Sequence, residues 1–564
     1  MRAAHTVADV RGAEAPLLAS LPPGALMQRA VSGLLSHAVG FLDGRVYGRR
    51  VVVLAGGGDN GGDALWVGAR LAARGARVDV LAPGRTHPEA TAALLAAGGR
   101  RHRVVAPGEV ATAAATAATA VTAATDSVAS RPLPDDRVSA LLAGADLVLD
   151  GLLGIGGRGG LRAAHARLAE LAPAARTIAV DVPSGVDADT GSVVGPAVRA
   201  ARTVTFGTYK RGLLLGAGAT HVGQLALVEI GLDLPEPDLT ALDDDDVAAL
   251  LPVPGPTDSK YTRGVLGLVG GSDRYPGAVV LATGGALRGG AGYLRVVAEA
   301  RAAEHVRRAH PEAVVTVIEP GDATAMLAAG RVQAWALGPG IVPGPAARQL
   351  VEALVGTDVP LLLDAGGLDP FAEAFAAGFR TGGAGGGFGF TVGFGPGTGG
   401  SGRGAGRVEP PASRETLARR AAPVLLTPHE GEFTRLTATA LGWDPEETGR
   451  ELAADRLATV RRASGELGVT VLLKGARTLV VEPGGAARVN TTGTPWLGSA
   501  GTGDVLTGLA GSLLAAGLGA LDAASVAAYL HGRAGELAPR PLAAADLPGL
   551  LPAARAGLRP GAVG

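Results

Sequence analysis

Short, uninterrupted apolar runs recur along the chain, each followed by a glycine-containing or polar loop and then by a helical stretch. Residues 51–55 form such a run, residues 64–74 have a helical pattern, and residues 78–81 form the next run. Apolar runs without alternation are typical of strands buried on both faces of a parallel sheet. The repeated strand–loop–helix pattern therefore predicts an α/β protein built from doubly wound parallel sheets.

Length and composition exclude several classes of protein. A chain of 564 residues is too long for one hydrophobic core, so we expect more than one domain. Hydrophobic residues make up 47% and charged residues 18%, and the net charge of −1 gives no basis for binding nucleic acid or an anionic membrane. The chain has no cysteine, which excludes disulfides and thiolate catalysis. Without an apolar leader segment at its start or an 18-residue apolar run, it is expected to be cytoplasmic.

In the first half of the chain, polar residues follow three strands at the point where each ends. The loop at 56–63 carries Asp59, Asn60 and Asp63, the strand at 145–150 ends in Asp150, and the strand at 177–180 runs into Asp181 and Ser184. Ligands of open α/β sheets bind at the carboxyl ends of the strands, so these side chains are expected to converge. Their oxygen atoms suit a hard, weakly held cation and proton transfer. A purely structural turn remains the alternative for the first loop.

A second constellation is the sequence GTGD at 501–504, which runs directly into the apolar segment 505–514. Three small residues before an acid predict a tight turn that opens a helix. The free backbone N–H groups and the dipole of a helix start bind anions, and Asp504 would lie beside a bound phosphate as a general base. The alternative is an aspartate that only caps a surface helix.

Other segments mark the domain organisation. Residues 1–45 have helical periodicity, and residues 233–258 are rich in proline and aspartate and predict a linker that contains a short helix. The strand pattern resumes at 265–269 and continues to 469–473. Residues 104–131 (Ala/Thr-rich) and 381–407 (Gly-rich) are expected to be insertions. The second is expected to be flexible, and a nucleic-acid-binding segment is the alternative for it.

The motifs GGGDNGGDA, VLDGLLGIGGRGG and VDVPSGVD resemble those of the NAD(P)H-hydrate epimerase family, over residues 1–232. The resemblance implies a Rossmann-like epimerase domain in which Asp181 faces the reacting ring as a catalytic residue. It implies a potassium ion held by Asn60, Asp150 and Ser184. It also implies that the hydrated nicotinamide nucleotide contacts Asp59, Asn60, Gly61, Gly62, Asp63, Gly154, Ile155, Gly156, Gly157, Arg158, Gly159, Gly160 and Asp181.

The motifs GGSDRYPGA, LGPGI, TPHEGEF, KGART and GTGDVLTG resemble the nucleotide-dependent NAD(P)H-hydrate dehydratase family, a branch of the ribokinase-like fold. The implied domain spans residues 259–556, with Asp504 as the catalytic base. The implied substrate contacts are Ala278, Gly340, His429 and Asp504. The implied nucleotide contacts are Lys474, Gly475, Ala476, Arg477, Thr478, Gly501, Thr502 and Gly503.

Together the two resemblances imply a bifunctional repair enzyme. It would epimerise NAD(P)H-hydrate and dehydrate the S epimer with ADP or ATP, using Mg²⁺ in one domain and K⁺ in the other. The C6 hydroxyl of the hydrate is a poor leaving group that phosphorylation makes a good one. We expect a homo-oligomer that binds neither nucleic acid nor membranes.

Two alternatives remain at this point. A ribokinase-like small-molecule kinase shares GTGD but leaves the N-terminal domain and TPHEGEF unexplained. The N-terminal half could instead be a non-catalytic binding module, because Asp59 and Ala64 stand where the epimerase family has Asn and Gly. An ordinary dehydrogenase is disfavoured because no GxGxxG follows a strand with an acid on the next strand.

Overall fold

The computed structural model describes residues 1–106, 132–157, 159–378, 416–417 and 419–558. The chain divides into two compact units, one of Met1–Ala241 with Glu451–Leu457 and one of Leu242–Arg450 with Ala458–Gly564. The two expected insertions, at 104–131 and 381–407, lie largely outside the described residues. Within the described part of the chain, no helix is both long and apolar enough to cross a membrane.

The first unit is built on a seven-stranded sheet of order β4-β3-β2-β5-β6-β7-β9, in which every neighbouring pair is parallel. Its strands are β2 (Arg50–Ala55), β3 (Arg77–Ala82), β4 (Arg100–Arg103), β5 (Leu147–Gly151), β6 (Thr177–Val180), β7 (Arg202–Phe206) and β9 (Gln224–Val228). A separate short strand, β1 (Arg2–His5), pairs with β8 (Tyr209–Lys210) and β10 (Leu239–Ala241).

Helices cover both faces of this sheet. Val51 and Val53 of β2 belong to one hydrophobic core, while Val52 and Leu54 belong to another, so the strand buries both its faces. This explains the continuous apolar run in the sequence. The first core contains α2 (Ala25–Phe41), α3 (Asp59–Ala73) and α4 (Pro88–Ala96), and the second contains α6 (Asp135–Ala143) and α7 (Ala163–Leu171). The helix α1 (Val7–Ser20) precedes them.

In the second unit, the strands follow the order β13-β12-β11-β14-β15-β16-β17-β18-β19. The pairs are parallel as far as β17, and the last two are antiparallel. The strands are β11 (Val265–Val269), β12 (Tyr293–Ala298), β13 (Val314–Val317), β14 (Ala334–Leu337), β15 (Leu361–Leu363), β16 (Val424–Leu426), β17 (Thr470–Leu473), β18 (Leu479–Val481) and β19 (Ala487–Val489).

The second unit also has helices in two layers. One layer packs into a single core and contains α8 (Asp244–Leu250), α9 (Pro276–Gly289), α10 (Ala300–Ala309), α18 (Thr502–Ala515), α19 (Ala520–Leu537) and α20 (Asp546–Ala556). The other contains α11 (Ala323–Ala328), α12 (Pro345–Val355), α13 (Leu368–Ala377) and α15 (Glu430–Leu441), which contact one another in turn. The described residues also form α16 (Pro445–Ala454) and α17 (Arg456–Leu467), and the segment Glu451–Leu457 of these helices is grouped with the first unit.

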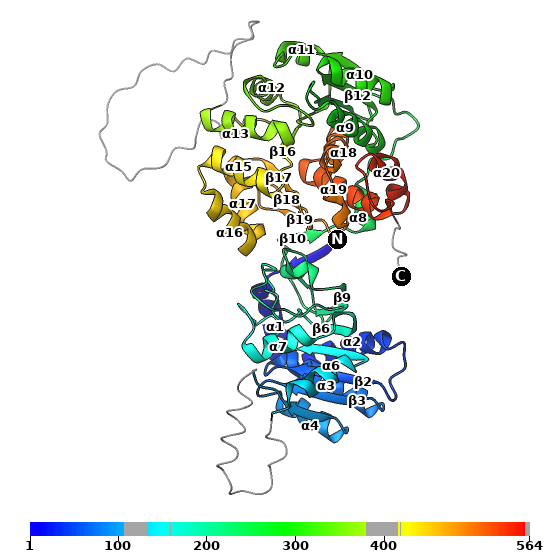
Figure 1. The fold of residues 1–564 in the computed structure, drawn as a ribbon, viewed down its shortest axis with the longest axis vertical. Coiled ribbons are helices and arrows are strands. Elements are labelled where there is room, and N and C mark those ends of the chain that lie inside the picture. Colours follow the sequence, from blue (N-terminus) through cyan, green and yellow to red (C-terminus); the bar gives the residue numbers. More distant parts are fainter. Residues whose placement is uncertain (107–131, 158, 379–415, 418, 559–564) are drawn as a thin grey trace, which may run out of the picture. The chain divides into compact units, whose positions relative to one another are not determined.

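The helices α9 and α18 lie side by side (Figure 1) and approach so closely that glycine is required at their contact. A Cβ at Gly285 would lie 2.2 Å from the carbonyl oxygen of Val505, and one at Gly508 would lie 1.8 Å from that of Ala282. Both distances are far inside van der Waals contact. The backbones of the two helices therefore interlock.

Both parallel sheets have a topological switch point, where successive connections leave in opposite directions. In the first unit it lies between β2 and β5, and in the second between β11 and β14. The helices that follow these strands pack into different layers, so their loops separate and leave a crevice at the carboxyl ends of the strands. Each switch point is therefore a natural place for a ligand.

The structure confirms the doubly wound α/β fold of both halves and the strands that the apolar runs predict. The turn predicted at 56–63 is wrong in its second half, because α3 begins at Asp59 rather than at Ala64. Gly58 caps the helix and Asp59 lies in its first turn, where a negative charge is favoured by the helix dipole. The residues 1–45 contain the predicted helices and, in addition, β1.

Candidate functional site

In the first unit, three of the predicted site residues meet around the backbone of Leu153. The Nδ2 of Asn60 donates a hydrogen bond of 3.0 Å to the Leu153 carbonyl oxygen, and the Ser184 hydroxyl accepts one of 2.9 Å from the Leu153 N–H. Ser184 also donates from its hydroxyl and its N–H to the two carboxylate oxygens of Asp150, at 2.7 and 2.8 Å. The ends of β2, β5 and β6 thus bring Asn60, Asp150 and Ser184 together, as the sequence predicts.

Asp150 is fully buried at this place. Burial raises its pKa to about 6, although the hydrogen bonds from Ser184 and Leu152 oppose the rise. A cavity of about 10 Å³, the size of one water molecule, lies beside it and is lined by Leu153, Gly154 and Ser184 among others. Asp150 and Asn60 do not line the cavity themselves but hydrogen-bond to Ser184 and Leu153, which do. Carboxylate, amide, hydroxyl and backbone oxygens are the ligands that suit a hard, weakly held cation.

Asp181 lies directly after β6 and forms a buried ion pair with Lys210. Its Oδ1 accepts hydrogen bonds from Lys210 Nζ at 2.5 Å, from the Thr205 hydroxyl at 3.0 Å and from the Phe206 N–H at 3.2 Å. The backbone of Asp181 is left-handed, with φ of 62°, a strained conformation that concentrates at functional sites. The carboxylate is therefore held in one orientation by three donors.

Two further acids face this ion pair. Asp63 is buried in α3, and its Oδ1 has no hydrogen-bond partner among the described residues. Burial, followed by the charges of Asp181, Asp59 and Glu14, raises its pKa well above the usual value. Burial likewise raises the pKa of Glu14 on α1, with Lys210 opposing. An unpartnered buried oxygen in a charged cluster indicates a place for a polar ligand.

The remaining predicted contacts of this unit line the same switch point. Asp59, Asn60, Gly61, Gly62 and Asp63 form the start of α3. Opposite them runs the loop of Gly154, Ile155, Gly156, Gly157, Gly159 and Gly160, while Arg158 lies outside the described residues.

Ala64, which stands where the epimerase family has glycine, is accommodated by the residue that faces it, Gly151. A Cβ placed on Gly151 would lie 2.6 Å from the Cβ of Ala64, so the methyl group fits only because position 151 is glycine.

In the second unit, Asp504 lies in the first turn of α18. Gly501 caps this helix in a left-handed conformation with φ of 89°, and Thr502 and Gly503 follow as its first residues. The turn predicted at 501–504 is therefore present and opens a buried helix. Burial and the charge of Asp364 raise the pKa of Asp504 to about 7, against the opposing effect of Lys474. That value suits a general base near neutral pH.

Lys474 forms the centre of the charges around Asp504. Its Nζ lies 2.8 Å from Asp364 Oδ1 and 3.6 Å from Glu432 Oε2. Burial alone would lower its pKa, but Asp364 and Glu432 outweigh burial and raise it, so the ammonium group stays charged. The other oxygen of Asp364 accepts a hydrogen bond of 2.6 Å from the Thr507 hydroxyl on α18.

The predicted substrate contacts of this unit come from three loops. Ala278, in the first turn of α9, lies against Gly340, where a Cβ would be 3.1 Å from that of Ala278. One turn further along α9, Leu281 lies against Gly501, which brings the start of α9 to the start of α18. His429 caps α15, is 57% exposed at its side chain and accepts a hydrogen bond from the N–H of Glu432.

The predicted nucleotide contacts lie on the loop after β17 and the start of α18. Lys474 follows β17, and Gly475, Ala476, Arg477 and Thr478 form the exposed or half-buried loop to β18. Arg477 donates a hydrogen bond of 2.6 Å to the carbonyl oxygen of Thr491. Lys474 brings this loop next to the 501–503 turn, because the Nζ of Lys474 lies 3.5 Å from where a Cβ of Gly503 would be.

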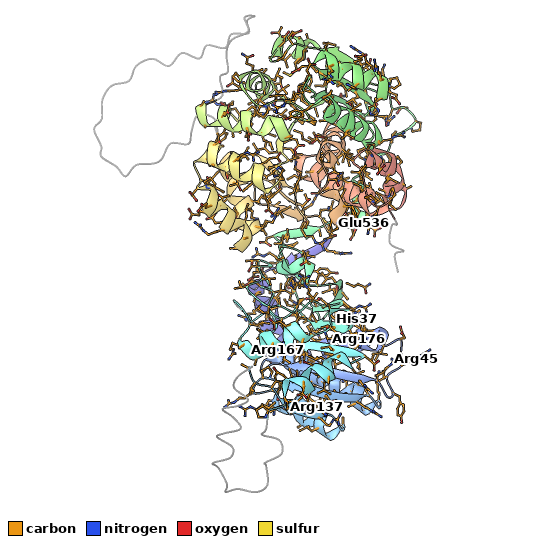
Figure 2. The ribbon with its side chains drawn as sticks, in the orientation of Figure 1. His37, Arg45, Arg137, Arg167, Arg176 and Glu536 are labelled. Carbon is orange, nitrogen blue, oxygen red and sulfur yellow. The ribbon has the colours of Figure 1, made fainter. Side chains whose placement is uncertain are left out.

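The helix α19 supports this turn from behind. His531 is buried, and its Nε2 donates a hydrogen bond of 2.9 Å to the carbonyl oxygen of Thr502. Burial lowers the pKa of His531 to about 4, so it is neutral at physiological pH. Glu536, labelled in Figure 2, accepts a hydrogen bond of 2.8 Å from the N–H of Gly493. Both ends of the segment from 493 to 502 are thus held by one helix.

Sequence reasoning missed Lys210, Asp364, Glu14 and His531. Lys210 follows a strand but is flanked by Arg211, and nothing in the sequence distinguishes the two basic residues. Asp364 ends an apolar run, the signal that singled out Asp150, and could have been found in the same way.

Comparisons with known proteins cover both units. A sequence family described as YjeF-related protein N-terminus matches residues 23–212, and one described as NAD(P)H-hydrate dehydratase matches residues 266–378 and 410–553. The bifunctional NAD(P)H-hydrate repair enzyme Nnr of Mycobacterium tuberculosis is 39% identical over 532 residues, which are 93% of this chain and 92% of the relative. The enzyme of the same name from Mycobacterium leprae is 38% identical over 555 residues, 97% of this chain and 96% of the relative.

Among solved structures, the ADP/ATP-dependent NAD(P)H-hydrate dehydratase of Bacillus subtilis, co-crystallised with ATP and Mg²⁺, is 27% identical, with a TM-score of 0.45. The match covers 57% of this chain and 99% of that one. The sequence matches extend over almost the whole length of the two mycobacterial relatives as well as of this chain. The chain therefore belongs to the family of bifunctional NAD(P)H-hydrate repair enzymes.

Proposed function

We propose that this protein repairs hydrated nicotinamide nucleotides by two reactions in two domains. Residues 1–232 form the domain that interconverts the R and S epimers of NAD(P)H-hydrate. Residues 259–556 form the domain that dehydrates the S epimer with ADP or ATP as phosphoryl donor, and residues 233–258 join the two. The observation that carries the proposal is the placement of Asp504, whose pKa is about 7, at an anion-binding helix start beside the Lys474 ammonium group.

In the dehydration, Asp504 accepts the proton of the C6 hydroxyl as that oxygen attacks the terminal phosphoryl group of the nucleotide. The N–H groups at the start of α18 and the charged Lys474 stabilise the negative charge on the phosphate. The ring nitrogen then donates its electron pair and phosphate leaves. Loss of a proton from C5 restores the C5–C6 double bond and hence NAD(P)H. Mg²⁺, when bound with the nucleotide, neutralises charge on the transferred group.

The residues that would contact the hydrate and the nucleotide in this domain come from separate loops. Ala278, Gly340 and His429 are proposed to hold the hydrated nicotinamide against Asp504. Lys474 to Thr478 and Gly501 to Gly503 are proposed to hold the nucleotide. The support is that Lys474 links the second group to Asp504 and that α9 packs its first turns against Gly501.

In the epimerisation, the C6 carbon must break and re-form one of its bonds to oxygen or nitrogen. Both routes require a proton to be delivered and withdrawn at a fixed position. Asp181 is proposed to move that proton, because Lys210, Thr205 and the backbone of Phe206 fix its carboxylate. The Oδ1 of Asp63, which has no hydrogen-bond partner in the part of the chain that the structure describes, would bind a polar group of the substrate.

A potassium ion is proposed to bind at Asn60, Asp150 and Ser184. The support is that Asn60 and Asp150 hydrogen-bond to Leu153 and Ser184, two residues that line a cavity of about 10 Å³, and that the three side chains carry amide, carboxylate and hydroxyl oxygens. The ion would orient the loop of Gly154 to Gly160 through the carbonyl oxygen of Leu153. A cytoplasmic location and a homo-oligomeric state are part of the same proposal.

One assay tests the two activities together. The purified protein is mixed with both C6 epimers of NADPH-hydrate, Mg²⁺, K⁺ and either ADP or ATP, and NADPH is followed by its absorbance. Recovery of nearly all the hydrate, faster than the epimers exchange unaided, is expected and identifies the donor. Recovery that stops near half would contradict the epimerase assignment, and no recovery with either nucleotide would contradict the dehydratase assignment. In the latter case, phosphate retained on a different small molecule would identify a kinase.

A further inference from the structure

A cavity of about 390 Å³ lies at the topological switch point of the second unit. Its walls come from the ends of β11 and β12 and from the loop between β14 and α12. The buried side chains of Val269, Val297, Ile318 and Leu350 make much of its lining apolar. Its volume and apolar walls are typical of sites for small organic ligands. None of the substrate or nucleotide contacts proposed above lines it.

Two features at its edge indicate the chemistry of the occupant. Glu299 lies directly after β12, the second strand of the β11–α9–β12 unit, and its Oε2 accepts a hydrogen bond of 2.9 Å from the Asp273 N–H. In dinucleotide-binding sheets, an acid at this place accepts the hydroxyls of a ribose. On the other side of the switch point, Gly344, Pro345 and Ala346 at the start of α12 line the cavity. The first backbone hydrogen bond of this 11-residue helix runs from the N–H of Arg348 to the carbonyl oxygen of Gly344. The N–H of Ala346 comes before that bond and has no partner within the helix, so it can bind an anion.

The cavity is also adjacent to the proposed substrate site. The hydroxyl of Ser272, which lines the cavity, donates a hydrogen bond of 2.8 Å to the carbonyl oxygen of Gly340. Gly271 lines it too, and its Cα lies 3.2 Å from where a Cβ of Gly340 would be. One pair of loops thus separates the cavity from Gly340 and Ala278.

We propose that this cavity binds the adenosine half of the dinucleotide hydrate, with its ribose hydroxyls on Glu299 and its phosphates near the start of α12. The nicotinamide half then extends past Gly340 toward Asp504. Because the Glu299 carboxylate repels a phosphate on the 2′ oxygen, the dehydratase acts on NADH-hydrate in preference to NADPH-hydrate. This inference rests on the proposed dehydratase function and extends it to the far end of the substrate.

The first experiment fills the cavity. Val342 lines the cavity and is 41% exposed, so Val342→Trp can fill the cavity from its open side. Val314 on β13 is 40% exposed but does not line the cavity, so Val314→Trp is the matched control. Steady-state dehydration is measured with the S epimer of NADH-hydrate and with the hydrate of reduced nicotinamide mononucleotide, which lacks the adenosine half. Val342→Trp is expected to raise the KM for NADH-hydrate about tenfold, the loss that 1.4 kcal/mol of binding produces. The truncated hydrate and the KM of the phosphoryl donor are expected to be unchanged, and Val314→Trp to behave as wild type.

The outcomes separate the two proposals. Turnover of both hydrates by the wild type with no change in Val342→Trp would overturn the cavity assignment and leave the dehydratase function standing. A rise in the KM of the donor alone would also overturn it, because the cavity would then hold the nucleotide that supplies the phosphate. Equal losses on the full and the truncated hydrate would show a disturbed catalytic centre and overturn it as well.

A second experiment tests Glu299. Glu299→Gln keeps the size of the side chain and removes its charge, and Glu304→Gln, on the helix α10 that Glu299 caps, is the control. The ratio of kcat/KM for NADPH-hydrate to that for NADH-hydrate is expected to rise at least fivefold in Glu299→Gln only. An unchanged or lower ratio would overturn the role of Glu299 in selecting the 2′ group.

Discussion

Lys474 Nζ lies 2.8 Å from Asp364 Oδ1, an ion pair that joins the carboxyl ends of β17 and β15 across the intervening β16. Glu432, from the helix that follows β16, lies 3.6 Å from the same ammonium group. Three neighbouring strands thus place two carboxylates around one lysine, next to Asp504. The negative charges keep Lys474 protonated and raise the pKa of Asp504.

The proposed dehydration should depend on pH through Asp504. A base must be ionised, so kcat/KM is expected to fall about tenfold for each pH unit below about 7, the pKa of Asp504. Glu432→Gln removes a negative charge that raises this pKa, so the pH profile should move to lower pH. The measurement is kcat/KM for the hydrate against pH with saturating nucleotide. Glu430→Gln, in the same turn of α15, is the control, and an equal displacement in both variants would contradict the assignment.

The two proposed reactions should be separable by two substitutions. Asp504→Asn is expected to lower dehydration by about 10²–10⁴-fold, the usual contribution of a general base, and to leave epimerisation unchanged. Asp181→Asn is expected to have the opposite pattern. Epimer exchange is measured by chromatography without nucleotide, and dehydration by the absorbance of NADPH. If either variant lost both activities equally, the two-site assignment would fail.

Potassium should stabilise the first unit through Ser184. A ligand that binds only the folded state raises Tm, so K⁺ is expected to raise the Tm of the wild-type protein and accelerate epimerisation. Ser184→Ala removes one proposed ligand and should weaken both effects, with more K⁺ needed for half of the maximal rate. Ser192→Ala, which changes another hydroxyl of the same unit, should respond to K⁺ as the wild type does. Equal responses of Ser184→Ala and the wild type would exclude Ser184 as a ligand.

His531 should make the folded state sensitive to acid. Its pKa is about 4 in the folded protein, against an ordinary value of 6.5. As pH falls below 6.5 the unfolded chain binds a proton that the folded chain does not, so stability is lost until about pH 4. The difference of about 2.5 pH units corresponds to about 3 kcal/mol.

The test compares the free energy of unfolding in urea at several pH values. His531→Gln keeps a hydrogen-bond donor but has no titratable ring, so it should lack this part of the acid sensitivity. The wild type should therefore lose about 3 kcal/mol relative to the variant between pH 6.5 and pH 4. His305→Gln, at an exposed position on α10, should follow the wild type. Parallel curves for the wild type and His531→Gln would refute the prediction.

Thr507 should contribute to stability through Asp364. Thr507→Val keeps the shape of the side chain but leaves a buried carboxylate oxygen without its 2.6 Å donor, which costs about 1–3 kcal/mol. Thr437→Val is the matched control, because its hydroxyl bonds only to carbonyl oxygens of its own helix. Urea unfolding measures both, and a cost at position 507 no larger than at 437 would contradict the role of the Asp364 contact.

The sequence was most informative where a strand ends in a polar residue. Parallel strands deliver their carboxyl ends to one edge, so Asp150, Asp181 and Ser184 could be placed together without any structure. The GTGD turn was predictable because glycine adopts the left-handed conformation that such a turn requires, as Gly501 does with φ of 89°.

The partners of these residues could not be predicted. Lys210 meets Asp181 across 29 positions, and Asp364 meets Lys474 across 110, through contacts that depend on the packing of loops. The start of α3 was misplaced because glycines in the segment 56–62 favour a turn locally. The helix there is stabilised by packing against β5, where Gly151 leaves room for Ala64.

The interlocked glycines of α9 and α18 limit how this enzyme can change. Gly285 and Gly508 bring the backbone of the helix that carries Ala278 into direct contact with the backbone of the helix that carries Asp504. A larger residue at either position would force the pair apart, because its Cβ would meet backbone atoms of the other helix rather than a side chain that a second substitution could shorten. The spacing between Ala278 and Asp504 is therefore set by backbone contact, whereas the loops that carry Gly340 and His429 can vary without disturbing it.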